Sequence, residues 1–165
     1  GSPIAPFLDG IWASTFVEHC APPGFPRGAA AAPGAGRITR QGLVVDGTTK
    51  TRAIVEINKG ANRDPAIDVN APLPEDGRRV PFAQMIYVAD GLSDVPAFAL
   101  LNDRGGHTFG VYPASPPGAE ERARSLLAQG RIQGVAEADF RPGRPAHRWL
   151  LDRLDGIAGG IAAGR

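Results

Sequence analysis

Cysteine is nearly absent from this 165-residue sequence, in which Cys20 is the single example. One thiol excludes an intrachain disulfide and a zinc site built from cysteines. No run approaches the roughly 20 apolar residues that a membrane-spanning helix needs. Together, the missing disulfides and the missing apolar run fit a reducing compartment, so we expect a cytoplasmic protein with no membrane partner.

An excess of charge of one sign is also missing. The 18 basic and 17 acidic side chains leave a net charge of +1, and the basic residues are scattered rather than gathered in a run. Nucleic-acid-binding domains usually carry a concentrated basic patch. We therefore expect no nucleic-acid partner. The apolar fraction of 42% and charged fraction of 21% are typical of a globular protein.

Glycine and proline, in contrast, are abundant, at 22 and 16 residues. Their number predicts many turns between short elements. Residues 21–37 consist almost wholly of Ala, Gly and Pro and should form a mobile surface loop with little to bury. The chain length suits one domain, which we place at residues 1–155, followed by a Gly-rich tail at 156–165 that should fray.

Short apolar runs alternate with amphipathic stretches along the chain. The expected strands are residues 11–17, 43–45, 85–89, 107–112 and 134–136, and the expected helices are residues 48–58, 95–101, 119–129 and 146–154. Thr48 or Thr49 would cap the first helix, Gly60 would end it, and residues 61–81 would form a loop. This alternation predicts an α/β fold, with a mostly parallel sheet and helices on both faces.

The segment from residue 85 to 112 is richest in chemistry. An apolar strand delivers Asp90 to its carboxyl end, where open α/β sheets place their ligands. Gly91 would let the backbone turn sharply, and Asp94 follows at the start of a helix. Two carboxylates across a tight turn can converge on Mg²⁺, which prefers oxygen ligands. The alternative is that Asp90-Gly91 is only a turn and Asp94 only a helix cap.

This segment resembles the fourth motif of haloacid dehalogenase (HAD)-superfamily phosphatases, in which a strand leads into Gly-Asp-Gly-x-x-Asp and a short helix. Ala89 replaces the first glycine here. Further similarity to a phosphoserine-phosphatase-like branch lies in residues 94–98, 105–106, 110–112, 130–132 and 138–140. The resemblance implies a three-layer, Rossmann-like core. It also implies Mg²⁺ as the cofactor, Asp90 and Asp94 as metal-site residues, and Gly91 beside the phosphate.

The resemblance also implies a lysine that neutralises the phosphate, and the sequence offers Lys50 and Lys59. They lie roughly 13 Å apart along the predicted helix, so both cannot reach one phosphate. Lys50 is at the start of this helix, where the family places its lysine, and the helix dipole there favours anions. We therefore expect Lys50 to be the catalytic, phosphate-binding lysine. Lys59, a cation at the helix C-terminus, is the alternative.

The family's nucleophile motif, Asp-x-Asp-x-Thr, is missing. The nearest match is the run from Val44 to Thr48, but valine stands at the nucleophile position and cannot attack phosphorus. We interpret Asp46-Gly47 as a turn. The nucleophile strand, the cap and the phosphate-binding Ser/Thr are therefore expected upstream of Gly1, and the chain alone should be inactive.

The favoured interpretation is the C-terminal part of a Mg²⁺-dependent phosphohydrolase. It would act on a small phosphorylated metabolite through an aspartyl-phosphate, with the remainder supplied by the same protein or a partner chain. A non-catalytic α/β module that binds a metal or a partner, and one chain of a two-chain hydrolase, are the alternatives. The adjacent His19 and Cys20 should point apart in a strand and form no catalytic pair. The isolated histidines at 107 and 147 should have structural or surface roles, and the tryptophans at 12 and 149 should pack in the core or a cleft.

Overall fold

The structure is a computed structural model that describes residues 5–17, 40–115 and 117–164. Within these residues the strands are Phe16–Val17 (β1), Arg40–Gln41 (β2), Ile86–Ala89 (β3), His107–Tyr112 (β4) and Gly134–Glu137 (β5). The helices are Gly47–Lys59 (α1), Val95–Asp103 (α2), Ala119–Ala128 (α3) and Pro145–Ala162 (α4). The expected loop at residues 21–37, together with His19 and Cys20, lies outside the described residues.

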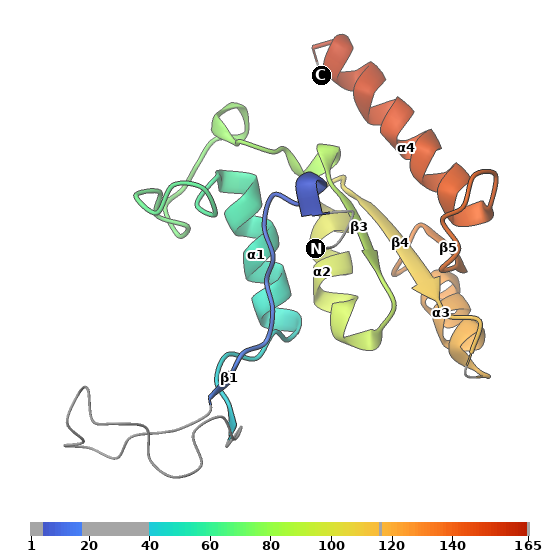
Figure 1. The fold of residues 1–165 in the computed structure, drawn as a ribbon. Coiled ribbons are helices and arrows are strands. Elements are labelled where there is room, and N and C mark those ends of the chain that lie inside the picture. The colour runs from blue at the N-terminus through green and yellow to red at the C-terminus, as the bar shows by residue number, and fades with distance from the viewer. Residues whose placement is uncertain (1–4, 18–39, 116, 165) are drawn as a thin grey trace.

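The main sheet is parallel, in the order β3-β4-β5, with β4 in the centre (Figure 1). Helix α2 connects β3 to β4, and α3 connects β4 to β5, as parallel neighbours require a crossover. β1 and β2 form a separate antiparallel pair. The α/β class and the parallel sheet predicted from the alternating pattern are therefore confirmed.

The two faces of this sheet are covered to different extents. On one face Phe98 of α2 and Leu126 of α3 pack together with Tyr87 and Val135 of the strands. On the other face Trp149 of α4 stacks on Phe109, with ring centroids 4.5 Å apart. Alternate strand residues point to opposite faces, which explains why β5 contributes Val135 to the first cluster and Ala136 to the second.

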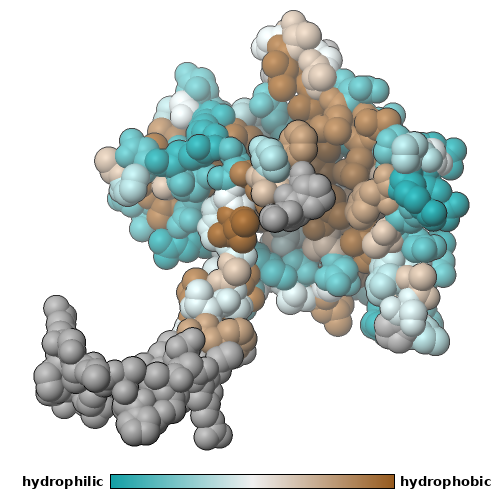
Figure 2. Space-filling view, viewed as in Figure 1, coloured by the Kyte–Doolittle hydropathy of each residue, from teal (hydrophilic) through white to brown (hydrophobic). Residues whose placement is uncertain are grey.

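On the sheet face that α4 covers, part of β3 remains exposed. Val88 lies beside Phe109 in the strand register, yet it is 37% exposed. Figure 2 shows apolar surface gathered along α4 and over the neighbouring part of the molecule. Among the described residues β3 pairs with β4 alone, so its other edge has free backbone groups. Apolar, unpaired edges of this kind favour addition of another strand.

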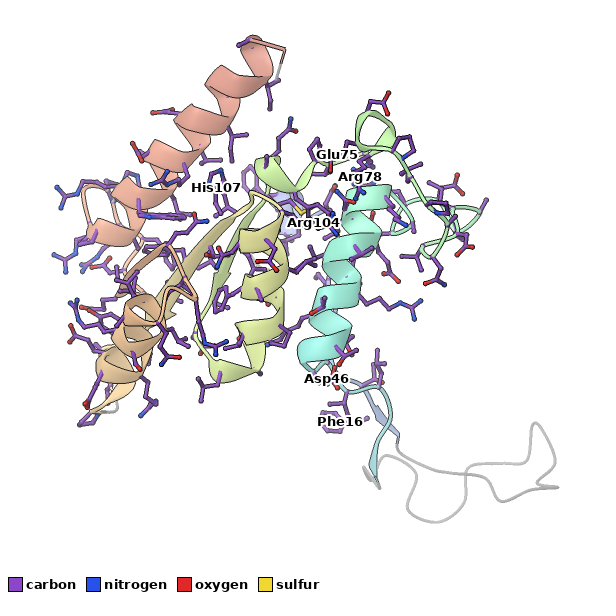
Figure 3. All side chains as sticks on the ribbon, turned by 180° about the vertical axis from the view of Figure 1, so that it is seen from behind. Phe16, Asp46, Glu75, Arg78, Arg104 and His107 are labelled. Atoms are coloured by element: carbon purple, nitrogen blue, oxygen red, sulfur yellow. The ribbon has the colours of Figure 1, made fainter. Side chains whose placement is uncertain are left out.

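Helix α1 brings its N-terminal turn against the segment that follows β3. Asp46 caps the helix by accepting a hydrogen bond from the Thr49 amide at 2.8 Å, and Gly60 ends it in the left-handed conformation. A Cβ atom at Gly47 would lie 2.8 Å from the Ser93 carbonyl oxygen, so only glycine allows this approach without a shift. Figure 3 shows Asp46 and Arg78 at opposite ends of α1.

Two of the expectations for α1 require correction. Asp46, which we interpreted as part of a turn, is the helix cap, and the cap is not Thr48 or Thr49. Asp46 outcompetes the threonines because its carboxylate reaches both the amide and the hydroxyl of Thr49. The expected end of the helix at Gly60 and the burial of Ile54 are confirmed.

The first two predicted strands are largely wrong. Only Phe16 and Val17 of residues 11–17 form a strand, and residues 43–45 form none. The amides of Leu43 and Val45 donate to the side-chain hydroxyls of Thr15 and Ser14, each at 3.0 Å. Hydroxyl groups thus replace the backbone partners that a longer ladder would need.

The C-terminal tail is also not as predicted. Helix α4 continues past Leu154 to Ala162, through most of the stretch expected to fray. Ile157 and Ile161 continue the helical spacing of Leu154, so the stretch keeps a helical pattern in spite of its glycines. Leu154 and Ile161 are 51% and 54% exposed, so this end of α4 buries little of its apolar surface. No helix among the described residues is both long and apolar enough to cross a membrane.

Candidate functional site

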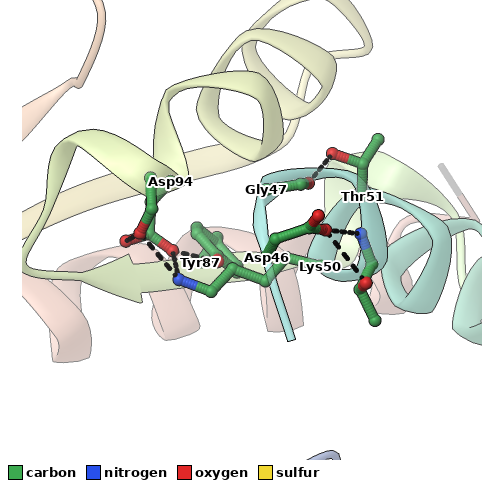
Figure 4. Close-up of polar contacts among 8 residues, drawn as sticks. Asp46, Gly47, Lys50, Thr51, Tyr87 and Asp94 are labelled. Carbon is green, nitrogen blue, oxygen red and sulfur yellow. Dashed lines mark hydrogen bonds and ion pairs between the residues drawn. The ribbon is translucent and has the colours of Figure 1, made fainter. Parts of the chain in front are cut away.

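An ion pair joins two elements that are distant in sequence. The Nζ of Lys50, in the first turn of α1, lies 2.8 Å from Oδ1 of Asp94, which precedes α2 (Figure 4). The Asp94 side chain is 3% exposed and that of Lys50 is 27% exposed. A buried carboxylate is costly unless a partner compensates its charge. Lys50 supplies this compensation while its ammonium group stays partly accessible.

The remaining hydrogen-bonding capacity of Asp94 is also used. The Tyr87 hydroxyl, from β3, donates to Oδ1 at 2.6 Å, and the Ser93 hydroxyl lies 3.4 Å from Oδ2. Lys50 also donates to the Ser93 hydroxyl at 3.1 Å. Three elements therefore meet at this carboxylate: α1, β3 and the short 3-10 helix Leu92–Asp94 (η4).

The contacts of Asp94 also test the alternative that this residue is only a helix cap. Asp94 occupies the N-cap position of α2, but its side chain makes no capping hydrogen bond. The interpretation of Asp94 as only a helix cap is therefore wrong. Its side chain turns instead toward Lys50 and Tyr87, so the carboxylate organises a polar cluster rather than the end of a helix.

Burial and the hydrogen bond to Asp94 change the ionisation of Tyr87. Partial burial disfavours the phenolate, and the hydrogen bond to the carboxylate together with its negative charge acts in the same direction. These effects raise the pKa of Tyr87 well above its ordinary value of about 10. Tyr87 is therefore a neutral hydrogen-bond donor at physiological pH, and it holds Asp94 in place.

Lys59, the alternative catalytic lysine, lies at the other end of α1. Its Nζ donates to the carbonyl oxygens of Val69 at 2.7 Å and Ala71 at 2.5 Å. These contacts tie the loop after α1 to the end of the helix. The two lysines are thus used differently, because Lys50 pairs with a carboxylate at the carboxyl end of β3 and Lys59 binds backbone carbonyls.

Asp90 follows β3 at its carboxyl end and has an exposed side chain. Among the residues that the structure describes, no hydrogen bond or ion pair engages its carboxylate. Asp90 and Gly91 line a cavity of about 230 Å³ that α3 closes from the other side. The carboxylate of Asp90 is thus available to a ligand at this edge of the sheet.

The expected role of Gly91 in a sharp turn is wrong. Its backbone is extended, with φ of −141° and ψ of 168°, and the chain turns only afterwards, in η4. A Cβ atom there would lie 3.6 Å from Oδ2 of Asp94, an ordinary contact. The position therefore does not require glycine for its conformation, whereas close approach of a ligand to the backbone would still favour it.

The fit of the described residues to the expected Mg²⁺ rests on two carboxylates, Asp90 and Asp94. Within the described ranges no group of three or more His, Cys, Asp or Glu side chains could hold a metal. Oδ1 of Asp94 already accepts from Lys50 and Tyr87. Asp90 is therefore the better placed ligand, and Asp94 could act through bound water. Mg²⁺ often keeps several waters and takes few carboxylates, so this partial set is compatible with it.

The isolated histidines and tryptophans are placed outside this cluster. Trp149 packs on Phe109 in the core, and Trp12 is exposed. His147 accepts a hydrogen bond from the Gly143 amide at 3.3 Å, within the turn that precedes α4. His107 begins β4, at the opposite end of the strands from Asp90. The positions of the histidines agree with structural and surface roles, and Trp149 packs in the core as expected, whereas Trp12 is too exposed to be a core residue.

Sequence reasoning missed Tyr87 and Ser93 as members of the cluster. A tyrosine hydroxyl inside an otherwise apolar strand was the available signal, because buried hydroxyls usually find a partner. Tyr87 and Ala89 share one face of β3, the face toward α2. Asp94 immediately precedes α2, so strand alternation alone pointed the Tyr87 hydroxyl toward it.

Comparison with known proteins gives little functional information. No family model matches the sequence, and no solved structure matches it. The chain is 32% identical over 157 residues to an uncharacterized protein of Borreliella burgdorferi (strain ATCC 35210 / DSM 4680 / CIP 102532 / B31). The alignment covers 93% of this chain and 52% of that protein, so the chain spans about half the length of this relative.

We predict that Lys50 and Asp94 are energetically coupled. Lys50→Met should lower the free energy of unfolding by about 2 kcal/mol, because it leaves the Asp94 carboxylate buried without its cation. Asp94→Asn should remove most of this effect, so the double variant should be less destabilised than the sum of the single variants. Urea unfolding of the four proteins measures the coupling.

Lys59→Met provides the matched control for this cycle. It removes a lysine from the same helix, but its partners are carbonyl groups at the far end. The changes in the free energy of unfolding caused by Lys59→Met and Asp94→Asn should therefore be additive. Equal coupling of the two lysines to Asp94 would contradict the assignment of Lys50 as its partner.

We also predict that Tyr87 ionises only above the ordinary tyrosine range. The sequence has two tyrosines, so a Tyr112→Phe variant reports Tyr87 alone in an ultraviolet absorbance titration. The pKa of Tyr87 is higher in the folded than in the unfolded chain. Its contribution to stability is therefore complete below about pH 10, the ordinary tyrosine pKa, and decreases as the pH rises above it. Adding Asp94→Asn should move the pKa back toward its ordinary value. Phenolate formation near pH 10 in the folded Tyr112→Phe protein would refute this prediction.

Proposed function

We propose that the chain is the C-terminal part of a HAD-like, Mg²⁺-dependent phosphohydrolase whose nucleophile lies outside residues 1–165. The observation that carries the proposal is the Lys50–Asp94 ion pair at the carboxyl end of β3. The resemblance to the fourth HAD motif requires a lysine at this point, and Lys50 comes from a helix more than 40 residues earlier in the chain.

In this proposal each residue of the site has a distinct task. Lys50 binds the transferring phosphoryl group and compensates its negative charge, since electrostatic stabilisation supplies most of the catalysis of phosphoryl transfer. Asp94 and Tyr87 position the Lys50 ammonium. Asp90 holds the magnesium ion, which when bound neutralises phosphate charge. Gly91 lets the phosphate approach the backbone. The substrate is a small phosphorylated metabolite.

The free edge of β3 supports the placement of the nucleophile in another segment. β3 is apolar and pairs on one side only among the described residues. A further parallel strand on this edge would end beside Asp90 and Lys50, because carboxyl ends of parallel strands meet at the same edge. An aspartate at the end of such a strand would face the phosphoryl group held by Lys50.

The same free edge favours one second candidate, a two-chain hydrolase. In that case the additional strand belongs to a separate polypeptide, and activity appears only when the two chains are mixed. If the chain is instead a non-catalytic module that keeps the fold without the chemistry, no activity should appear with the chain alone or after mixing with another polypeptide. The proposed compartment is the cytoplasm.

We predict that residues 1–165 alone do not hydrolyse phosphate esters with Mg²⁺. The gene should encode Asp-x-Asp-x-Thr upstream of Gly1, and the longer product should be active. In that product Lys50→Met should lower kcat by about 100-fold or more, because a preorganised charge is lost. Lys59→Met, the control, should stay within a few-fold. Assays of phosphate release at saturating substrate measure this.

Two results would contradict the proposal. Magnesium-dependent turnover by residues 1–165, lost in Asp90→Ala, would show that the nucleophile lies within the chain. An upstream sequence without the aspartate motif would favour the two-chain enzyme or the non-catalytic module. Reconstitution with a second polypeptide would then separate these two.

A further inference from the structure

A groove runs between η4 and helix α3 and opens at the carboxyl end of β3. It consists of two adjoining cavities, of about 230 and 460 Å³, which share the side chains of Leu92, Arg122 and Leu126. The smaller cavity reaches Asp90 and Gly91. The larger one continues along α3 toward Arg131. A ligand bound at Asp90 therefore has a path to extend along this helix.

Arg122 stands where the two cavities meet, and its guanidinium has no side-chain partner among the described residues. Its Nη1 lies 3.4 Å from the place a Cβ atom would occupy at Gly118, in the turn that follows β4. The neighbouring Arg124 is different, because its Nε donates to Glu120 at 2.7 Å. The guanidinium of Arg122 thus offers unused donors beside the candidate site.

The rest of the groove is suited to an apolar body with an anionic end. Leu92 is 68% exposed although it is a large apolar side chain, and Leu126 forms a buried floor beneath it. At the far end Arg131 donates through Nε to Gln129 at 3.1 Å, which leaves its other donors free. Arginine donors match carboxylate and phosphate oxygens in a two-point geometry.

We propose that Arg122 binds a second anionic group of the substrate, while the apolar body between the two anionic groups lies on Leu92 and Leu126. This inference rests on the proposed function, because it takes the Lys50 side as the phosphoryl position. A site with this arrangement binds organic phosphates that carry two anionic groups more tightly than simple monoesters. Arg122 would be a substrate-binding residue that sets specificity and takes no part in the chemical step.

Binding of matched probes to residues 1–165 in the presence of Mg²⁺ tests this. Phenyl phosphate carries one anionic group, whereas 4-carboxyphenyl phosphate and 1,4-phenylene bisphosphate carry two. Titration calorimetry should show that the two-anion probes bind about tenfold more tightly or better than phenyl phosphate, the gain expected of a charged hydrogen-bonded pair. The stronger of the two identifies the second group as carboxylate or phosphate.

Arg122→Gln should reduce the affinity of both two-anion probes to that of phenyl phosphate. Arg124→Gln, an exposed arginine on the same helix outside both cavities, should leave the preference intact. An unchanged preference in Arg122→Gln, or no preference in the unmodified chain, would overturn the inference.

Lys50→Met separates this inference from the proposed function. It should weaken phenyl phosphate and the two-anion probes alike, because all share the phosphoryl group. Unchanged binding of phenyl phosphate in Lys50→Met would count against the proposed function. A loss of preference confined to Arg122→Gln would still identify Arg122 as an anion-binding residue.

Discussion

The buried carboxylate of Asp94 is the constraint on which the candidate site depends. It sits between a strand and a helix, where an uncompensated negative charge would be strongly unfavourable. Lys50 and Tyr87 make this burial possible, and in doing so they fix α1 and β3 relative to η4. The close approach of Gly47 to the Ser93 carbonyl oxygen brings the first turn of α1 near enough for the ion pair to form.

The sheet has an open edge beside this cluster. Three parallel strands, with α2 and α3 on one face and α4 on part of the other, leave the edge of β3 unpaired among the described residues. The cluster, Asp90 and the groove beside α3 all lie around the carboxyl end of that edge strand. An additional strand would complete both the sheet and, in our proposal, the chemistry.

The sequence predicted best what depends on local patterns. Apolar runs and capping residues predicted the main helices and the parallel strands, because burial and backbone geometry decide them locally. The short strands at residues 11–17 and 43–45 were wrong, since Ser14 and Thr15 hydroxyls replace backbone partners there. Lys50 and Asp94 were each expected at the site through a family resemblance, but the ion pair between them was not predicted. Strand alternation indicated the direction of the Tyr87 side chain, but its hydrogen bond to Asp94 depends on tertiary packing.

The central claim is that Lys50, and not Lys59, binds phosphate at this site. Because the sequence contains two lysines, the lysine side-chain signals in an NMR spectrum are few enough to follow individually. Adding inorganic phosphate with Mg²⁺ should shift the Lys50 signal and leave the Lys59 signal unchanged, and Asp90→Asn should abolish the magnesium-dependent part of the shift. A Lys50 signal that does not respond, or a response confined to Lys59, would contradict the account.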